Sequence, residues 1–255
     1  MQQAKQSRRV RNISKLFLIG IGLDKGDISL KAVEAIKKCK KIYLESYTSV
    51  GISKKYLQEI SGKEIESEPR SFFEGKSQLI IKEAKSKNVA LLIQGDCLSA
   101  TTHISLLQEA SDKGVVIEVI HGISIFTAIS ETGLSLYNFG KTASIPFENE
   151  NVKTPYGVVK NNLENGMHSL ILLDLNPQEK RFLSSKEGLA YLLKNGLDKN
   201  AKAVICSRLG TKRRDIKFGK VEELVKIDLR HYPQCIILIG NTHFVEEDYL
   251  NKFKV

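Results

Sequence analysis

Short apolar runs alternate with segments of helical spacing along almost the whole chain. The runs are five to seven residues long and predict strands at 16–21, 42–46, 90–94, 115–119, 143–147, 169–175, 203–207 and 235–240. Helical spacing is present at 29–39, 76–86, 102–113, 124–132, 154–165, 185–195 and 244–253. Alternation of this kind predicts an α/β fold with mostly parallel sheets.

The length of 255 residues is long for one domain and comfortable for two. No repeat relates the two halves, and "VIHGIS" at 119–124 has the turn-like centre expected of a boundary. We therefore predict an N-terminal α/β domain at 15–121 and a C-terminal α/β domain at 122–255. Polar composition predicts exposed loops at 67–76 and 211–219.

The first fourteen residues are predicted to form a basic arm outside the fold. Together with Lys15, the leading segment carries five cations and no acid, which is half of the net charge of +10. It has no apolar core of the kind found in signal peptides. No run approaches the roughly 18 apolar residues of a membrane span. Because no aromatic stacking platform accompanies the arm, its charge alone does not predict nucleic-acid binding.

The four cysteines, Cys39, Cys97, Cys206 and Cys235, lie far apart in the sequence. None forms a CxxC pair or stands at metal-ligand spacing from a histidine, so no metal site is predicted. All but Cys97 fall in apolar patterns typical of buried thiols. This usage suits a reducing, cytoplasmic compartment.

The first candidate site is "GIGLDKGD" at 20–27, directly after a predicted strand. A dinucleotide fingerprint needs glycine at position 25, where Lys25 stands, and no ribose-binding acid follows. A Rossmann site is therefore not predicted. Two interpretations remain open, a plain strand-to-helix turn and a loop whose backbone approaches a ligand closely.

The second candidate is "QGDCLSATTH" at 94–103, where a buried strand gives way to a helix. Open α/β sheets bind ligands at such junctions. Asp96 is either a turn acid or a ligand contact, and Thr101 or Thr102 is expected to cap the helix. Cys97 would be reactive only if a helix terminus activated it, and His103 is expected to be structural.

Three further polar residues, Ser124, Asp174 and Arg208, stand at the ends of predicted strands or the starts of helices. Ser124 is expected to be an N-cap. The sequence contains no nucleophile elbow, HExxH motif or paired-carboxylate motif, so we assign no catalytic residue.

Taken together, these stretches resemble the diphthine synthase family. The blocks that carry the resemblance are "FLIGIGLDKGDISLKAVEAIKKCKKIYLESYTS", "QGDCLSATTH", "VIHGISIFTAISETGLSLYNFGKTASIPF" and "NGMHSLILLDL". Their order and spacing match from about residue 16 to about residue 246. Other methylases of the same fold share only the glycine turn and a GDP-like loop.

The resemblance implies a tetrapyrrole-methylase fold, in which two α/β domains hold S-adenosylmethionine in the cleft between them, and a homodimer. It also implies repeated methylation of an amino nitrogen on translation elongation factor 2, where a histidine carries a 3-amino-3-carboxypropyl group. The product is diphthine. The alternatives are a methyltransferase of the same fold acting on RNA or a tetrapyrrole, and a binding module without turnover.

The family's cofactor contacts fall on eight positions of this sequence: Leu23, Asp96, Ser99, Ser124, Ile125, Leu173, Leu209 and Gln234. The family more often has proline at Cys97, an apolar residue at Ser99, alanine at Leu209 and histidine at Gln234.

The resemblance also places Tyr47 and Thr48 on the acceptor side of the site. A sulfonium already activates its methyl group, so the chemistry needs alignment of donor and amine in a dry site. No metal or covalent nucleophile is expected.

Overall fold

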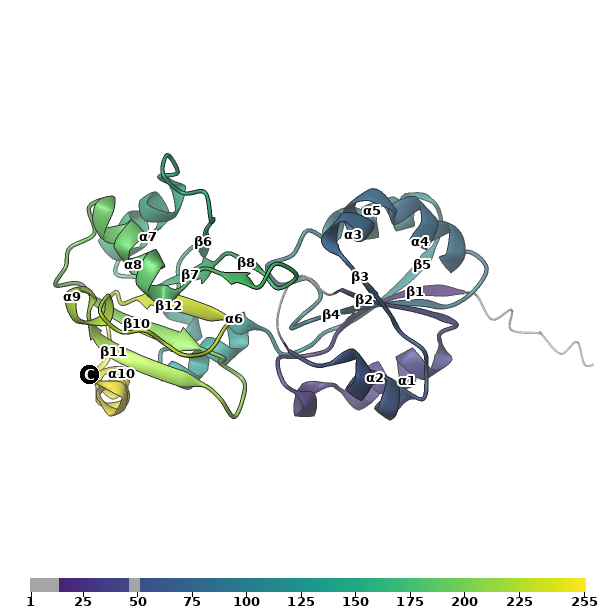
Figure 1. Cartoon of the computed structure of the whole chain (residues 1–255), viewed down its shortest axis with the longest axis horizontal. Coiled ribbons are helices and arrows are strands. Elements are labelled where there is room, and N and C mark those ends of the chain that lie inside the picture. Colours follow the sequence, from purple (N-terminus) through teal and green to yellow (C-terminus); the bar gives the residue numbers. More distant parts are fainter. Residues whose placement is uncertain (1–13, 46–50) are drawn as a thin grey trace, which may run out of the picture.

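Two five-stranded sheets follow one another along the chain, each with its own helices (Figure 1). The computed structural model describes residues 14–45 and 51–255. The predicted basic arm, apart from its last residue, lies outside this part of the chain, as do Tyr47 and Thr48. Within the described part, no helix has the length and apolar character needed to cross a bilayer.

The first sheet is entirely parallel, with the order β3-β2-β4-β1-β5. Its strands are β1 (Lys15–Gly20), β2 (Lys41–Glu45), β3 (Glu66–Glu68), β4 (Val89–Ile93) and β5 (Val116–Ile120). The residues of β4 are all buried, as expected for a central parallel strand with helices on both faces. We call residues 15–120 the first half of the molecule.

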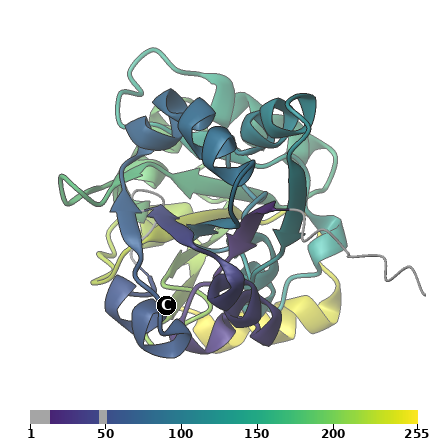
Figure 2. The same ribbon diagram turned by 90° about the vertical axis from the view of Figure 1, so that its right-hand side faces the viewer.

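Helices cover both faces of this first sheet (Figures 1 and 2). One layer contains α1 (Leu30–Lys38) and α2 (Lys54–Ser61), and the other contains α3 (Arg70–Gly75), α4 (Ser77–Ala84) and α5 (Ile104–Asp112). Ser29 caps α1 by accepting a hydrogen bond from the Ala32 N–H group.

The second sheet has the order β11-β10-β12-β7-β6 and is antiparallel except for the pair β6 and β7. Its strands are β6 (Ala143–Ile145), β7 (Ser169–Leu173), β10 (Lys202–Ser207), β11 (Asp215–Lys220) and β12 (Gln234–Leu238). The short strands β8 (Leu175–Asn176) and β9 (Arg181–Phe182) form a separate hairpin. The prediction of mostly parallel sheets is thus correct for the first sheet and wrong for the second.

One of the three antiparallel pairs of the second sheet, β10 with β11, is joined by a short turn, which antiparallel neighbours allow and parallel neighbours do not. The turn between β10 and β11 occupies 208–214, where Arg208 and Gly210 adopt the left-handed conformation with φ of 52° and 77°. The hydrophobic pattern of a strand is the same whichever way the strand runs, so the sequence did not reveal the antiparallel pairing.

Two segments predicted to be exposed loops contain buried structure. Residues 70–75 form α3, which buries Phe72 and Phe73, and residues 215–220 form β11, which buries Ile216 and Phe218. The alternation in "DIKFGK" is a strand pattern, but three charged residues in six made the segment read as polar.

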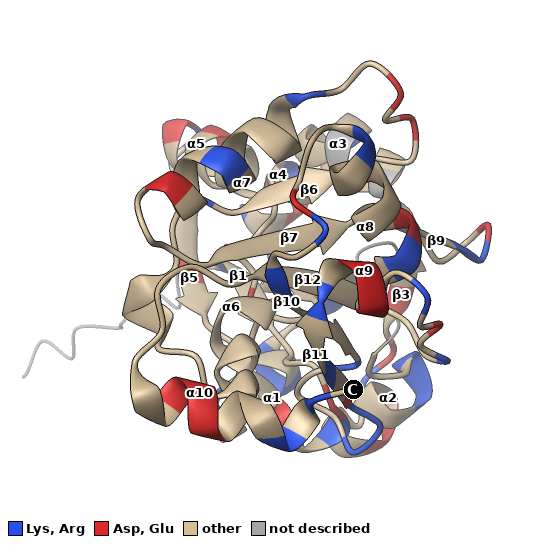
Figure 3. Ribbon diagram, turned by 90° about the vertical axis from the view of Figure 1, so that its left-hand side faces the viewer, with Lys and Arg blue, Asp and Glu red and all other residues tan. Residues whose placement is uncertain are grey.

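The second half, residues 125–255, is also three-layered. Its first apolar cluster lies between the sheet and α7 (Thr154–Glu164), α8 (Ser185–Lys194) and α9 (Val221–Leu224). Its second lies under α6 (Ile125–Ala128), η2 (Ile129–Thr132) and α10 (Phe244–Leu250). Short 3₁₀ turns also occur at η1 (Lys25–Asp27), η3 (Leu136–Asn138) and η4 (Asn251–Phe253). Most charged residues lie on the helices and loops around the sheet (Figure 3).

Three glycines bring the carboxyl ends of β1, β4 and β5 into contact. A Cβ atom on Gly20 would lie 2.7 Å from both the Gly122 nitrogen and the Gly95 oxygen, and one on Gly122 would lie 2.4 Å from the Gly95 oxygen. Gly22 and Gly95 exchange two backbone hydrogen bonds of 3.0 and 2.9 Å. Gly20 and Gly122 leave no room for a side chain, and Gly95 adopts the left-handed conformation with a φ of 78°. We call Gly20, Gly95 and Gly122 the glycine junction.

Gly20→Ala is therefore expected to lower the free energy of unfolding by about 1–3 kcal/mol, because the added methyl group meets backbone that cannot rotate away. Gly26→Ala is the matched control, since a Cβ atom there would meet nothing within 4 Å. It should stay within about 0.5 kcal/mol of wild type. Chemical denaturation of both variants measures the difference, and equal stabilities would contradict the close approach.

Candidate functional site

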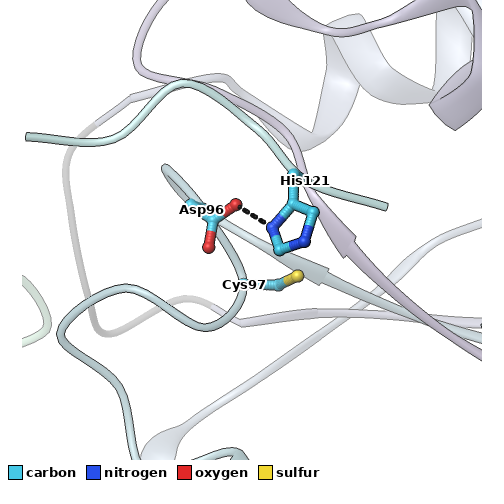
Figure 4. A group of neighbouring side chains, drawn as sticks. All are labelled: Asp96, Cys97 and His121. Atoms are coloured by element: carbon cyan, nitrogen blue, oxygen red, sulfur yellow. Dashed lines mark hydrogen bonds and ion pairs between the residues drawn. The ribbon is translucent and has the colours of Figure 1, made fainter. Parts of the chain in front are cut away.

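Asp96 links the loop after β4 to the segment that leaves β5 (Figure 4). Its Oδ1 atom accepts hydrogen bonds from the Leu98 N–H group at 2.9 Å and from the Ser99 hydroxyl at 3.1 Å. Its Oδ2 atom lies 2.8 Å from Nδ1 of His121 and accepts a bond from the Gly122 N–H group at 3.1 Å. One buried carboxylate therefore connects two loops that are 25 residues apart in sequence.

The hydrogen bonds decide the charge of this carboxylate. Burial by itself would raise the pKa of Asp96, but the donors on Leu98, His121, Gly122 and Ser99 together lower its pKa below the ordinary value. Asp96 is therefore ionised at neutral pH and acts only as a hydrogen-bond acceptor.

The segment that follows Gly122 enters the second half through a capped helix. Ser124 is the N-cap of α6, as its sequence position predicts, and it accepts a hydrogen bond from the Phe126 N–H group. Thr127 completes the cap by accepting from the Ser124 N–H group. Ile125, the first residue of α6, packs against the apolar cluster of the second half.

Leu23 lies between loops from the two halves. Its N–H group donates to Oδ2 of Asp27 at 2.9 Å. Its side chain lies 3.7 Å from the position that a Cβ atom of Gly95 would occupy and 2.7 Å from the corresponding position at Gly210. Leu209, beside Gly210, is buried in the cluster against which Leu23 packs. The predicted contacts Leu23 and Leu209 thus meet at the interface between the halves.

The predicted contacts Leu173 and Gln234 lie at the same end of the second sheet, where β7 ends and β12 begins. Strand register pairs Gln234 with Ser207 and Leu172 with Cys235, so the start of β12 lies beside the ends of β10 and β7. The hairpin that follows β7 projects towards the first half (Figure 1). This end of the second sheet therefore faces the first half.

Their side chains, however, are occupied within the second half. The side-chain oxygen of Gln234 accepts from the Ser185 N–H group at 2.7 Å, and its NH₂ group donates to the carbonyls of Leu229 and His231. Leu173 is buried in the cluster beneath α8. Both residues would reach a ligand only through their backbone.

A cavity of about 550 Å³ lies between the halves and falls in the size range of small-molecule sites. Both halves and the segment between them line it, with Asp27, Ser29, His121, Gly122, Ile123, Thr127, Ala128, Ser130, Glu131 and Gly210. None of the eight predicted contacts is among these residues, and only Ser124 and Leu209 have a direct chain neighbour, Ile123 and Gly210, in the lining. The sequence signals for His121 and Asp27 were their places in "VIHGIS" and "GIGLDKGD", whereas no signal pointed to Glu131 itself.

Asp96, Cys97 and His121 each place a possible metal-ligand atom within 4.8 Å of the others (Figure 4). The thiol of Cys97 is fully buried, and desolvation raises its pKa to about 11. Its sulfur lies 3.5 and 3.6 Å from the carbonyl oxygens of Leu18 and Ile120. A metal would need the thiolate and would displace N–H donors from Asp96, so this donor set fits a hydrogen-bonded loop and not a metal site.

The end of the "QGDCLSATTH" loop differs from its prediction. Neither Thr101 nor Thr102 caps α5, because the helix begins at Ile104 and the hydroxyl of Thr101 donates to the Cys97 carbonyl. His103 holds the N-cap position without a side-chain capping bond. Its Nε2 atom lies 3.1 Å from Oε1 of Glu45, and both side chains are buried.

Comparison with known proteins identifies the family to which this chain belongs. The sequence profile of the tetrapyrrole (corrin/porphyrin) methylases matches residues 15–225. The chain is 42% identical to the diphthine synthase of Methanocaldococcus jannaschii over 249 residues, which cover 92% of this chain and 97% of that protein. It is 41% identical to the diphthine synthase of Methanococcus aeolicus over 247 residues, covering 92% and 96%.

Solved structures of diphthine synthases have the same fold as this chain. A crystal structure of diphthine synthase superimposes with a TM-score of 0.88 at 36% identity, covering 94% of this chain and 96% of that one. A putative diphthine synthase from Entamoeba histolytica superimposes with a TM-score of 0.85 at 32% identity, covering 95% and 99%. The predicted fold class is confirmed.

The four cysteines are all free and buried, so native protein should react only slowly with a thiol reagent, and all four should react in denaturant. Burial raises the pKa of Cys39 to about 12 and that of Cys97 to about 11, which leaves little thiolate at neutral pH. Mass spectrometry after timed alkylation measures this. A fast native thiol that disappears in Cys97→Ala would contradict it.

Proposed function

Because this chain belongs to the tetrapyrrole methylase family, and within it to the diphthine synthases, we propose that it methylates the amino nitrogen of 3-amino-3-carboxypropyl-histidine in translation elongation factor 2. The donor is S-adenosylmethionine, and repeated transfer gives diphthine. The chain is a methyltransferase of diphthamide biosynthesis; the acceptor and the repetition are our proposals. They are supported above all by similarity to diphthine synthases that spans both halves and the loops between them.

The residues between the halves fit such a donor. The cavity offers the carboxylates of Asp27 and Glu131 to the cationic parts of the molecule and the apolar side chains of Ile123 and Ala128 to its adenine.

We propose the eight positions carried over from the family as donor contacts: Leu23, Asp96, Ser99, Ser124, Ile125, Leu173, Leu209 and Gln234. Leu173 and Gln234 would act through their backbone, because their side chains are occupied within the second half.

When bound, S-adenosylmethionine supplies an activated methyl group, and this chain supplies alignment and exclusion of water. Asp96 holds the loop at 95–99 against the segment at 121–124, and the capped start of α6 fixes the direction in which this segment continues. Leu23 packs across to Gly210 and so relates the two halves at the site. A rigid frame of this kind is what an in-line transfer between two bound molecules requires.

Four wider features complete the proposal. The chain divides into a basic arm at 1–14 and domains at 15–121 and 122–255. It forms a homodimer, it is cytoplasmic and it acts on a protein rather than a nucleic acid. Exposed apolar side chains such as Tyr137 and Phe244 are consistent with a surface that a second copy covers.

The acceptor is tested by incubating the protein with labelled S-adenosylmethionine and one of three acceptors. Elongation factor 2 carrying the 3-amino-3-carboxypropyl group should become labelled, and mass spectrometry should count the methyl groups on its modified histidine. Ribosomal RNA and a tetrapyrrole precursor should remain unlabelled. Label on either of these, with none on the factor, would replace the proposed acceptor.

Asp96→Asn should weaken S-adenosylmethionine binding by about 10- to 150-fold. A charge-assisted contact contributes roughly 1.5–3 kcal/mol, and an amide cannot accept all four hydrogen bonds that hold the loop. Calorimetry measures the affinity, and a denaturation curve verifies folding. Asp112→Asn, on the exposed end of α5, is the matched control.

Cys97→Pro, which restores the residue common in the family, should bind the donor normally. Wild-type affinity in Asp96→Asn would make the acid a turn residue only. Loss of binding in folded Cys97→Pro would give position 97 a role that the buried thiol does not suggest.

A further inference from the structure

Asp96 and His121 form a pair in which one side chain is buried and the other is exposed. The carboxylate is 8% exposed and the imidazole is 70% exposed, although their hydrogen-bonding atoms are only 2.8 Å apart. His121 also lines the cavity between the halves. The acid therefore anchors the ring from inside the protein while the rest of the ring faces the cavity between the halves.

This hydrogen bond fixes the tautomer of the ring. Asp96 is ionised and can only accept, so Nδ1 of His121 must carry the proton in their shared bond. In the neutral ring the lone pair then belongs to Nε2. A carboxylate that holds Nδ1–H and leaves Nε2 basic is the arrangement that general-base histidines require.

The proposed reaction needs such a base. An aliphatic amine beside a carboxylate is protonated at neutral pH, and an ammonium nitrogen has no lone pair with which to attack a methyl group. After each of the first two transfers the product amine again carries a proton that must leave before the next transfer. A base beside the acceptor is therefore needed in every round.

We propose that His121, oriented by Asp96, is the general base that deprotonates the acceptor amine. This inference rests on the proposed function. Nε2 takes one proton from the ammonium group, and the freed lone pair forms the N–CH₃ bond. The C–S bond of the donor breaks with its electron pair remaining on sulfur, which becomes a neutral thioether. The imidazolium then returns the proton to solvent before the next round.

The groups around the ring favour His121 over its neighbours. Asp27 accepts hydrogen bonds from the Leu23 and Asp24 N–H groups, and Glu131 pairs with Arg214 at 3.4 Å. Cys97, also near the ring, is a buried thiol. Among the described residues that line the cavity, His121 is the one imidazole.

His121→Asn separates the two functions of the side chain. The asparagine amide nitrogen occupies roughly the place of Nδ1, so the bond to Asp96 can persist while the basic nitrogen is lost. Donor affinity by calorimetry should remain within about twofold of wild type. The rate of methyl transfer near pH 7 should fall by about 10²- to 10⁴-fold.

The pH profile distinguishes a base from a structural residue. The wild-type protein should transfer methyl groups at neutral pH, because it supplies the base itself. The His121→Asn rate should be low at neutral pH and recover only at alkaline pH, where solvent deprotonates the amine. His243→Asn is the matched control, because His243 is an exposed cap of α10 outside the cavity, and it should keep the wild-type profile.

A second measurement does not depend on turnover. In ¹⁵N spectra of the histidine rings, the signal absent from His121→Asn should show a neutral ring protonated at Nδ1, and Asp96→Asn should abolish that preference. A ring protonated at Nε2 in the wild type would overturn the proposal. If His121→Asn melts early, His121→Gln, which also lacks a base, replaces it in both measurements.

The result can be separated from failure of the proposed function. A wild-type protein that methylates no form of elongation factor 2 would refute the function itself. An active wild type whose His121→Asn variant keeps the same rate and pH profile would refute only the role of His121.

Discussion

The contact between the carboxyl ends of three parallel strands is the constraint on which the rest of the molecule depends. Gly20, Gly95 and Gly122 approach so closely that a single methyl group on Gly20 or Gly122 would collide with backbone. Asp96 then joins the loop after β4 to the chain leaving β5 through four hydrogen bonds. Together they determine where the chain leaves the first half, and hence where the second half begins.

The positions of α6 and of Leu23 depend on this junction. Ser124 starts α6 two residues after Gly122, and Leu23 reaches from the first half to the turn at Gly210. The cavity lies where these segments diverge. Because buried hydrogen bonds lower the pKa of Asp96, the same acid that holds the loops can also orient His121.

Ser99, Gln234 and Cys97 stand where the resemblance implies other residues, and each has contacts within the protein. The hydroxyl of Ser99 donates to Asp96, so it adds a bond to the loop that an apolar residue could not make. Gln234 offers both an acceptor and a donor, and it satisfies the start of α8 as well as two carbonyls of the loop at 229–231. Cys97 fills a buried space against backbone carbonyls and needs no reactivity to explain it. These residues stabilise the frame of the site.

The sequence by itself determined the α/β class, most strand positions and the cap at Ser124, because burial and capping leave local patterns. Only the tertiary structure decided the antiparallel direction of the second sheet, since the hydrophobic pattern of a strand carries no information on the direction of its neighbours. The same holds for the pairing of Asp96 with His121 and for the inward-facing side chains of Leu173 and Gln234. These depend on which distant segments meet, and one-dimensional spacing does not encode that meeting.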